Sequence, residues 1–338
     1  MPTTTLNADP SRTTVLRSKF VGQMNKRFRA VKGAINELVI DDDAFGLKEP
    51  VTFNPMVGNV ERQAWRFQTN EDKIKSFQRW LQEQVDGKIL TIDTQTGKPW
   101  TNGFIESAHQ KGVLRGYLDA RSADFDIPSD LIDGTQTEFL RDSFTQRLSV
   151  RSVQRIATRT FNDLKNITID MSNQISKILT KSFAEGRGVR VVARLLNKEV
   201  DKLTRTRARA IARTEIVHAH AEGQLDAFEA LGIEEVGVFA EWSTAGDDRV
   251  CAMCRPLQGV VMTIKEARGL IPRHPNCRCA FIPADSDNRQ PGQFWSKTKI
   301  DVAVGRSAKA ERPKSKNQRV AKRGSSWTGS KKKFKTKG

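Results

Sequence analysis

The chain has 338 residues, of which 37% are hydrophobic and 28% are charged. It is long enough for two or three domains and has enough apolar residues for at least one core. The net charge of +18 indicates an anionic partner, and the usual kinds are nucleic acid, an anionic membrane and an acidic protein. A membrane is the weakest candidate, because no apolar run approaches the roughly 20 residues that span a bilayer. Residues 1–16 also lack the apolar core of a secretory signal, so we expect a protein made in a reducing cytosol.

Three helices are predicted in the first part of the chain. Apolar residues recur at spacings of three and four over residues 16–38, which is typical of one face of a helix. The members of this stripe are Leu16, Phe20, Met24, Phe28, Val31, Ile35 and Leu38. Shorter patterns of the same kind predict helices over residues 72–85 and 104–118. We recognise no functional motif before about residue 135.

The longest helical pattern runs over residues 137–184. Its apolar stripe includes Leu140, Phe144, Leu148, Val153, Ile156, Phe161, Leu164, Ile175, Ile178 and Phe183. β-Branched residues over 166–170 predict a kink, and Gly186 and Gly188 end the pattern. Two further helices are predicted over residues 189–200 and 206–231, and Gly232 stops the second. The simplest role of these stripes is core packing or helix pairing.

After Gly232 the pattern changes to short strands and turns. Strands are predicted over residues 235–244, 259–262 and 278–282, the last ending at Pro283, with a helical turn over 265–270. Elements this short are not stabilised by apolar burial alone. The predicted fold class is mainly α with a small α+β Cys-rich module, an elongated helical N-terminal region and a disordered basic tail. The expected boundaries are 1–135, 136–232, 233–285 and 286–338.

All four cysteines of the chain, Cys251, Cys254, Cys277 and Cys279, lie within 29 residues. In a cytosolic protein this clustering favours a metal site over disulfides. A Cys-x2-Cys turn presents two thiolates to one ion, and a second pair about twenty residues later completes the tetrahedron that zinc prefers. Metal binding would then stabilise a segment that is too small to fold alone. The sequence therefore predicts a structural zinc site.

Five groups compete for the four positions around such an ion. Cys251, Cys254 and Cys277 belong to every set, and the fourth ligand is either Cys279 or His274. The alternatives to zinc are a pair of disulfides or four reduced thiols in a small core. A catalytic zinc would need an open coordination position and a general base. The Pro-Cys-x2-Cys element of zinc deaminases is absent, and the chain has too few histidines for an HNH-type nuclease.

Several motifs occur together and in order in the second half of the chain. They are Arg213-Thr214-Glu215, Glu241-Trp242-Ser243-Thr244, Asp247-Asp248-Arg249-Val250-Cys251-x2-Cys254, Leu257-x-Gly259 and His274-Pro275-x-Cys277-Arg278-Cys279. This composite resembles the phage Mu F-like head morphogenesis family over roughly residues 140–285. The succession of these elements is far more restrictive than a single Cys-x2-Cys.

The resemblance implies a minor capsid protein, present in few copies in the head of a tailed phage. Members of the family associate with the portal and act in procapsid assembly and maturation. Some bind DNA, and some are thought to be ejected with the genome. The expected location is the capsid interior near the portal, after assembly in the host cytoplasm. On this basis we expect a structural protein and not an enzyme. The rivals are a metal-dependent nuclease of the packaging process and a host-type DNA-binding regulator.

The matching positions outside the cysteine cluster are interpreted as structural. They are Arg213, Glu215, Trp242, Asp248 and Gly259. We expect Arg213 and Glu215 to form salt links that dock their helix on the Cys-rich module. His218 and His220 point to different helix faces and are not predicted to chelate one ion. His109 is isolated in the sequence and receives no role.

Residues 297–338 contain fifteen Lys or Arg against two acids, which accounts for +13 of the net charge. Such a segment cannot bury enough apolar surface to fold, so we predict a disordered tail. Its cations would neutralise phosphates of double-stranded DNA without sequence preference. The candidate DNA-binding residues are Lys314, Lys316, Arg319, Lys322, Arg323, Lys331, Lys332, Lys333, Lys335 and Lys337. The alternatives are an acidic portal or scaffold surface as partner, or a solvated tail with no dedicated role.

Overall fold

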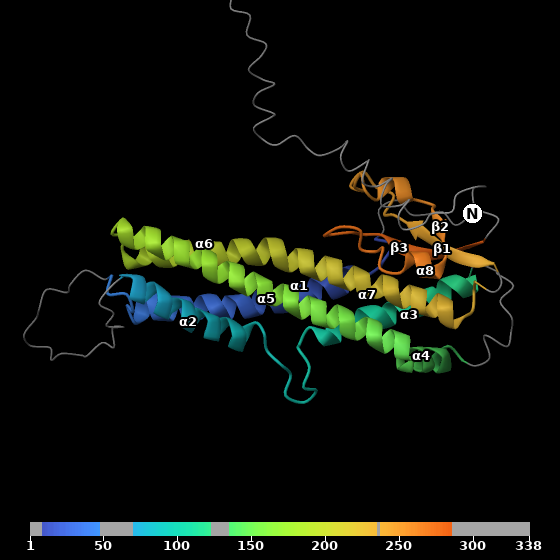
Figure 1. Cartoon of the computed structure of the whole chain (residues 1–338), viewed down its shortest axis with the longest axis horizontal. Coiled ribbons are helices and arrows are strands. Elements are labelled where there is room, and N and C mark those ends of the chain that lie inside the picture. The colour runs from blue at the N-terminus through green and yellow to red at the C-terminus, as the bar shows by residue number, and fades with distance from the viewer. Residues whose placement is uncertain (1–8, 48–69, 123–134, 235–236, 286–338) are drawn as a thin grey trace, which may run out of the picture.

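The computed structural model describes residues 9–47, 70–122, 135–234 and 237–285. Long helices run along the long axis of the molecule, and a small three-stranded sheet lies at one end (Figure 1). The fold is mainly α with a small strand-containing module near residue 260, which confirms the predicted fold class. The predicted DNA-binding lysines and arginines of the tail lie outside the described residues. No helix in the described ranges is both long and apolar enough to cross a membrane.

The first three helices follow the predicted stripes closely. Helix α1 covers Thr14–Asn36 and ends in a π-helical turn over Glu37–Asp41, α2 covers Asn70–Lys88, and α3 covers Asn102–Ser122. Phe20, Met24 and Ile35 of the α1 stripe are completely buried. The stripe therefore faces a core, as amphipathic periodicity predicts.

The long helical pattern is divided into α4 (Gln136–Thr145) and α5 (Arg147–Ala184). A capping box between Thr135 and Glu138 starts α4 and satisfies its first free amide groups. The interruption falls at Gln146, whose backbone is extended. Over residues 166–170, where the sequence predicted a kink, α5 stays helical and Ile167 is buried in the core.

Helices α6 (Val189–Leu203) and α7 (Arg209–Ala230) are joined by a π-helical turn over Thr204–Ala208. The chain therefore continues from α6 into α7 without a loop. Beyond α7 the module contains β1 (Val238–Ser243), a 3-10 turn (Arg255–Leu257), β2 (Val261–Met262), α8 (Ile264–Ala267) and β3 (Ala280–Asp285).

The sheet is antiparallel, with strand order β2-β1-β3. Ala240 of β1 lies opposite both Met262 of β2 and Pro283 of β3. Strand β3 therefore continues past Pro283, where the sequence predicted its end. A proline is tolerated there because β3 is an edge strand, so the missing N–H interrupts no ladder on its outer side.

Two main cores stabilise the molecule. The first lies between α1, α2, α5 and α6, and the second joins α3 and α7 to the strand module. Within the second region α3 and α7 approach at backbone contact. A Cβ on Gly112 of α3 would collide with the carbonyl of His220, and a Cβ on Gly223 of α7 would collide with the carbonyl of His109. Glycine at these positions permits the close crossing on which the module rests.

Candidate metal centre

The five predicted donors are presented by two similar turns. In the first turn the amide of Cys254 donates to the carbonyl of Cys251 at 3.1 Å, and in the second the amide of Cys277 donates to the carbonyl of His274, also at 3.1 Å. Cys-x2-Cys and His-x2-Cys thus adopt the same local hydrogen bond. Cys279 follows the second turn, immediately before β3.

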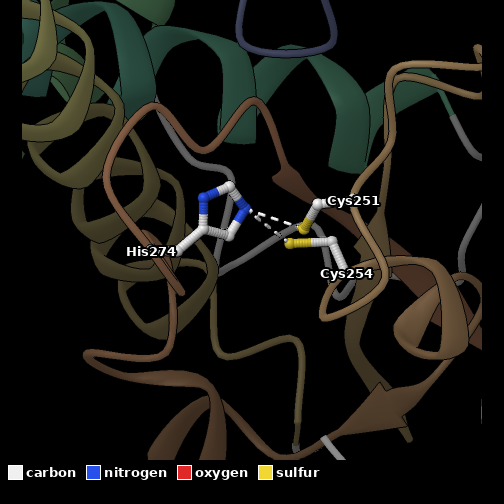
Figure 2. A group of neighbouring side chains, drawn as sticks. All are labelled: Cys251, Cys254 and His274. Atoms are coloured by element: carbon white, nitrogen blue, oxygen red, sulfur yellow. Dashed lines mark hydrogen bonds between the residues drawn. The ribbon is translucent and has the colours of Figure 1, made fainter. Parts of the chain in front are cut away.

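The imidazole of His274 points at the sulfurs of the first turn (Figure 2). Its Nε2 lies 3.0 Å from Sγ of Cys251 and 3.2 Å from Sγ of Cys254, and the latter sulfur lies 4.0 Å from Sγ of Cys277. Ligand atoms around one tetrahedral zinc are separated by roughly 3.5–3.8 Å, given the usual Zn–N and Zn–S bond lengths. The three separations bracket that range, but the Cys277 sulfur lies more than 4.8 Å from at least one of the other two donors, so it must move closer to complete a four-ligand site.

The other nitrogen of the His274 ring is also engaged. Nδ1 lies 2.8 Å from the carbonyl oxygen of Pro275. A carbonyl only accepts, so Nδ1 carries the proton and donates. In the neutral ring this leaves the lone pair of Nε2 directed at the sulfurs of Cys251 and Cys254. Metal-ligating histidines are commonly oriented by such a bond from the second nitrogen.

The donors form two overlapping groups whose ligand atoms lie within 4.8 Å of one another. One group is Cys251, Cys254 and His274, and the other is Cys254, Cys277 and Cys279. All four cysteines are free thiols, so the structure does not contain the alternative pair of disulfides. The structure thus brings together all five predicted donors, in an arrangement that could hold a metal ion.

Two groups of the cluster, the imidazole of His274 and the thiol of Cys277, have shifted pKa values that favour their charged forms. The pKa of His274 is raised to about 9, mainly by its interaction with Cys277 and then by the bond to Pro275. Hydrogen bonds from Cys254 and Cys279 lower the pKa of the Cys277 thiol. Metal binding requires the neutral imidazole, so an ion would have to displace the His274 proton. Metal affinity is therefore expected to fall as the pH falls.

Asp247 and Arg278 link the two ligand-bearing segments. The two terminal nitrogens of Arg278, Nη1 and Nη2, contact the carboxylate of Asp247 at 2.7 and 2.5 Å. Nη2 of Arg249 contacts the same carboxylate at 3.1 Å. The hydrogen bond from Arg278 is the main reason that the pKa of Asp247 lies well below its usual range. The residue predicted from the motif is the neighbouring Asp248, which is exposed. Asp247 was missed, although its partner Arg278 stands between two predicted ligands.

Trp242 and Gly259 of the predicted motif both support the sheet. Trp242 is buried on β1 and meets the ring of Phe281 edge to face, with 5.8 Å between ring centroids. The amide of Gly259 donates to the carbonyl of Trp242 at 2.9 Å. Its φ of +76° lies in the left-handed region, which a side chain would strain. Both residues contribute to the frame of the cluster.

The module is joined to α7 by hydrogen bonds from the buried Gln224 and the half-buried Thr214. The Gln224 amide pairs with both backbone groups of Phe281 in β3, donating to the carbonyl at 2.6 Å and accepting from the amide at 3.2 Å. The backbone amide of Asn276 donates to the hydroxyl of Thr214 at 3.1 Å. These contacts place the second ligand turn and β3 against one face of α7.

Arg268 makes the principal ion pairs between the module and α7. Its guanidinium lies 3.3 Å from Glu222 and 2.7 Å from Asp226, and it also contacts Glu229. The carboxylate of Asp226 also accepts from Ser149 of α5 at 2.9 Å and lies 2.8 Å from Nε2 of His109 in α3. His109, which received no role from the sequence, therefore belongs to the buried network beneath the module.

The predicted role of Arg213 and Glu215 is wrong. Glu215 is buried and pairs with Arg159 of α5, at 2.6 and 3.0 Å, instead of with the module. Arg159 also contacts Nδ1 of His218. Burial raises the pKa of Glu215 and lowers that of His218 to about 3, with Arg159 adding to the second shift. Among the described residues, Arg213 makes no salt link to the module, and it lies at the interface between α7 and α1.

Comparison with protein-family models gives one match. Residues 173–282 match the model of the family described as Phage Mu protein F like protein. The matched segment runs from α5 to β3 and contains all five donors of the metal centre, so the resemblance predicted from the motifs is confirmed over about a third of the chain. No curated protein and no solved structure gave a significant match.

Proposed function

Because residues 173–282 carry a Phage Mu F-like region, we propose that this chain is a minor head protein that acts in phage head morphogenesis. The family match is the observation that carries the proposal. It points to a location in the virion and to other head components as partners. Within that role we assign the portal as the main protein partner, packaged double-stranded DNA as a second contact, and passage out of the head with the genome as the fate of the protein.

The arrangement of the chain supports separate roles for the long helices, the strand module and the basic tail. The long helices, which run along the long axis of the molecule in Figure 1, would provide an elongated surface for head proteins. The strand module is fixed to α7 through Arg268 and Gln224 and would act as a rigid connector. The basic tail, residues 286–338, would contact DNA through its lysines and arginines.

We propose a structural and not a catalytic role for the metal centre. With four protein ligands an ion has no open position for a water or a substrate. The competing function is a metal-dependent nuclease. Incubation of the full chain with plasmid and divalent metal distinguishes them: the structural role requires no cleavage, whereas cleavage abolished by Cys277→Ser would establish the nuclease.

The head-protein role is tested by locating the chain in purified virions. We expect the protein inside the head in low copy number, and we expect the purified chain to associate with portal. A phage that lacks the protein should assemble fewer mature heads. Absence of the chain from virions and procapsids, together with normal head assembly without it, would refute the role.

We propose zinc as the ion and Cys251, Cys254, His274 and Cys277 as its ligands. Each of the two turns that share this hydrogen bond supplies two of these groups, whereas Cys279 follows Cys277 at the tighter x1 spacing. Elemental analysis should find about one zinc per chain. His274→Ala should lose the metal and Cys279→Ala should retain it. If Cys279→Ala lost the metal and His274→Ala retained it, the fourth ligand would be Cys279 instead of His274. Absence of metal from the wild-type protein would refute the site.

The tail proposal is tested by removing residues after Phe294. We expect most DNA affinity to disappear while the helical circular-dichroism signal stays unchanged. Binding by the full chain should weaken steeply with salt, since it depends on counterion release. Sequence-specific binding that persists at high salt would instead indicate a regulator, and full affinity in the truncated chain would refute the tail contact.

A further inference from the structure

A second basic feature lies on the helical body, between the start of α1 and the start of α7. It is a hollow of about 430 Å³, many times the roughly 30 Å³ that one water molecule occupies in the liquid. Its walls are lined by Thr14, Arg17, Ser18, Asn25, Arg209 and Arg213, together with small and apolar residues. Three arginines and no carboxylate line it among the residues that the structure describes.

Arg17 is the buried member of the group and is only partly satisfied. The residue is 8% exposed, and its Nη2 contacts Asp9 and the hydroxyl of Thr14. Its other terminal nitrogen, Nη1, is buried and has no hydrogen-bond partner in the described part of the protein. An unpaired donor on a buried cation is costly, so Arg17 retains capacity for a further acceptor.

The two arginines of α7 are unpaired. Arg209 and Arg213 are four residues apart, so they project from the same face of the helix. Neither has an ion-pair or hydrogen-bond partner within the described ranges, and the same holds for the Ser18 hydroxyl and the Asn25 amide across the hollow. Arg213 is close enough to Arg17 to contribute to lowering its pKa, after the larger effect of burial. Asp9 therefore compensates Arg17 alone, and the charges of Arg209 and Arg213 have no acidic partner among the described residues.

We propose that the hollow between α1 and α7 binds a phosphate group, held by the guanidinium groups of Arg17, Arg209 and Arg213. Guanidinium donors match the geometry of phosphate oxygens and form charge-assisted hydrogen bonds with them. Donors from several directions, with Ser18 and Asn25 opposite α7, suit a tetrahedral anion better than a planar carboxylate. The two uncompensated arginines also balance the charge of roughly −1.5 to −2 that a phosphate monoester carries near neutral pH.

The phosphate could be free or could belong to a DNA backbone, and the site is independent of both the tail and the head-protein role. The test uses the full chain and an arginine-selective dicarbonyl reagent, with modification of each arginine followed by mass spectrometry. Inorganic phosphate is one probe and a short DNA duplex is the other. Arg190 and Arg194 of α6 serve as internal controls, because they are exposed, helical and also four residues apart.

We expect inorganic phosphate to protect Arg209 and Arg213 in a saturable manner while Arg190 and Arg194 stay reactive. Protection by both probes assigns free phosphate and backbone phosphate as ligands. Protection by phosphate alone restricts the site to the free anion, and protection by the duplex alone restricts it to the backbone. The proposal is overturned if neither probe protects Arg209 and Arg213, or if Arg190 and Arg194 are protected equally.

A pair of double variants gives a second readout that does not depend on chemical modification. Arg209→Gln/Arg213→Gln should weaken phosphate binding in calorimetry by about tenfold or more, since loss of charge-assisted bonds costs at least about 1.4 kcal/mol. Arg190→Gln/Arg194→Gln removes the same charge elsewhere and should leave binding unchanged. Both variants should keep the wild-type circular-dichroism spectrum. Equal affinity in the two variants would contradict the site even if protection were seen.

Discussion

In the helical body, apolar stripes from helices distant in sequence pack into one core, whereas the strand module combines its apolar core with a cluster of candidate metal ligands and with buried polar contacts to α7. Phe20 and Met24 of α1 illustrate the first kind of stabilisation, since both are fully buried among apolar neighbours. Gln224 and Arg268 illustrate the second, because they join the module to its support through hydrogen bonds and charge. The body should therefore tolerate loss of metal, and the module should not.

The interface between α7 and the strand module can be tested by substitution, because the acidic groups on its α7 side are buried. Glu222 and Asp226 are 1% and 3% exposed, and Arg268 is the cation that faces both. Burial opposes ionisation of Asp226, but the bonds from His109 and Arg268 outweigh it and lower the pKa of this carboxyl. Removal of Arg268 would leave negative charge without compensation in a desolvated site.

The largest effect on this interface is expected from Arg268→Met. Breaking a buried ion pair on one side typically costs about 3–5 kcal/mol, and we expect a loss of that order from the free energy of unfolding of the module. Amide hydrogen exchange of β1 and β3 at increasing urea concentration measures it, because fluorescence of the six tryptophans would report both regions. Arg249→Met is the matched control, because its side chain is 72% exposed and exposed pairs contribute about 0–1 kcal/mol. Equal losses in the two variants would show that the ion pairs do not hold the module.

A second effect concerns the buried histidine between α5 and α7. The pKa of His218 is lowered from 6.5 to about 3, chiefly by burial and then by Arg159 and Arg155. Between pH 6.5 and about 3, His218 is therefore protonated in the unfolded chain but largely neutral in the folded chain. Stability should fall as the pH falls below 6.5, by roughly 1.4 kcal/mol per pH unit from this group, and should be unaffected by it above 6.5. The raised pKa of Glu215 offsets part of this loss.

His218→Gln isolates this contribution, because the glutamine oxygen still accepts from Arg159 but does not titrate. Urea unfolding at several pH values should show a slope that is smaller by about one proton in the variant. His274, whose pKa is raised instead, titrates in another part of the molecule and is unchanged by the substitution. A slope that is identical in the variant and the wild type would show that His218 is not buried as a neutral group.

The smallest of the three effects is expected at the crossing of α3 and α7. In Gly112→Ala the new Cβ meets the backbone carbonyl of His220, so the helices must separate, and overpacking of this kind typically costs about 1–3 kcal/mol. Gly33→Ala in α1 is the control, since its Cβ meets nothing within 4 Å. That change should stabilise the protein by about 0.5–1 kcal/mol through helix propensity. Thermal unfolding should show a lower melting temperature for Gly112→Ala and a higher one for Gly33→Ala than for the wild type.

The helical body was largely predictable from the sequence, because its helices carry regular apolar periods. The predicted helix over residues 16–38 corresponds to α1 and its π turn, and the five donors of the metal centre were identified from local spacing alone. The break at Gln146 was missed, since it reflects one extended residue inside an uninterrupted apolar pattern.

The contacts that join the two regions were not predictable in the same way. Gln224 and Phe281 are 57 residues apart, and Arg268 and Asp226 are 42 residues apart. A polar residue on a helix is usually solvent-exposed, and no local spacing shows that Gln224 instead meets the backbone of β3. The interpretation of Glu215 failed for the same reason, because its partner Arg159 lies on a different helix.

Amide hydrogen exchange of the full chain, before and after exhaustive chelation, tests most directly whether the metal holds the module together. We predict that amides of β1, β2 and β3 lose protection on chelation, whereas those of α1 and α5 keep it, because the core of these helices contains none of the candidate metal ligands. Equal protection of the strands with and without metal would contradict the account.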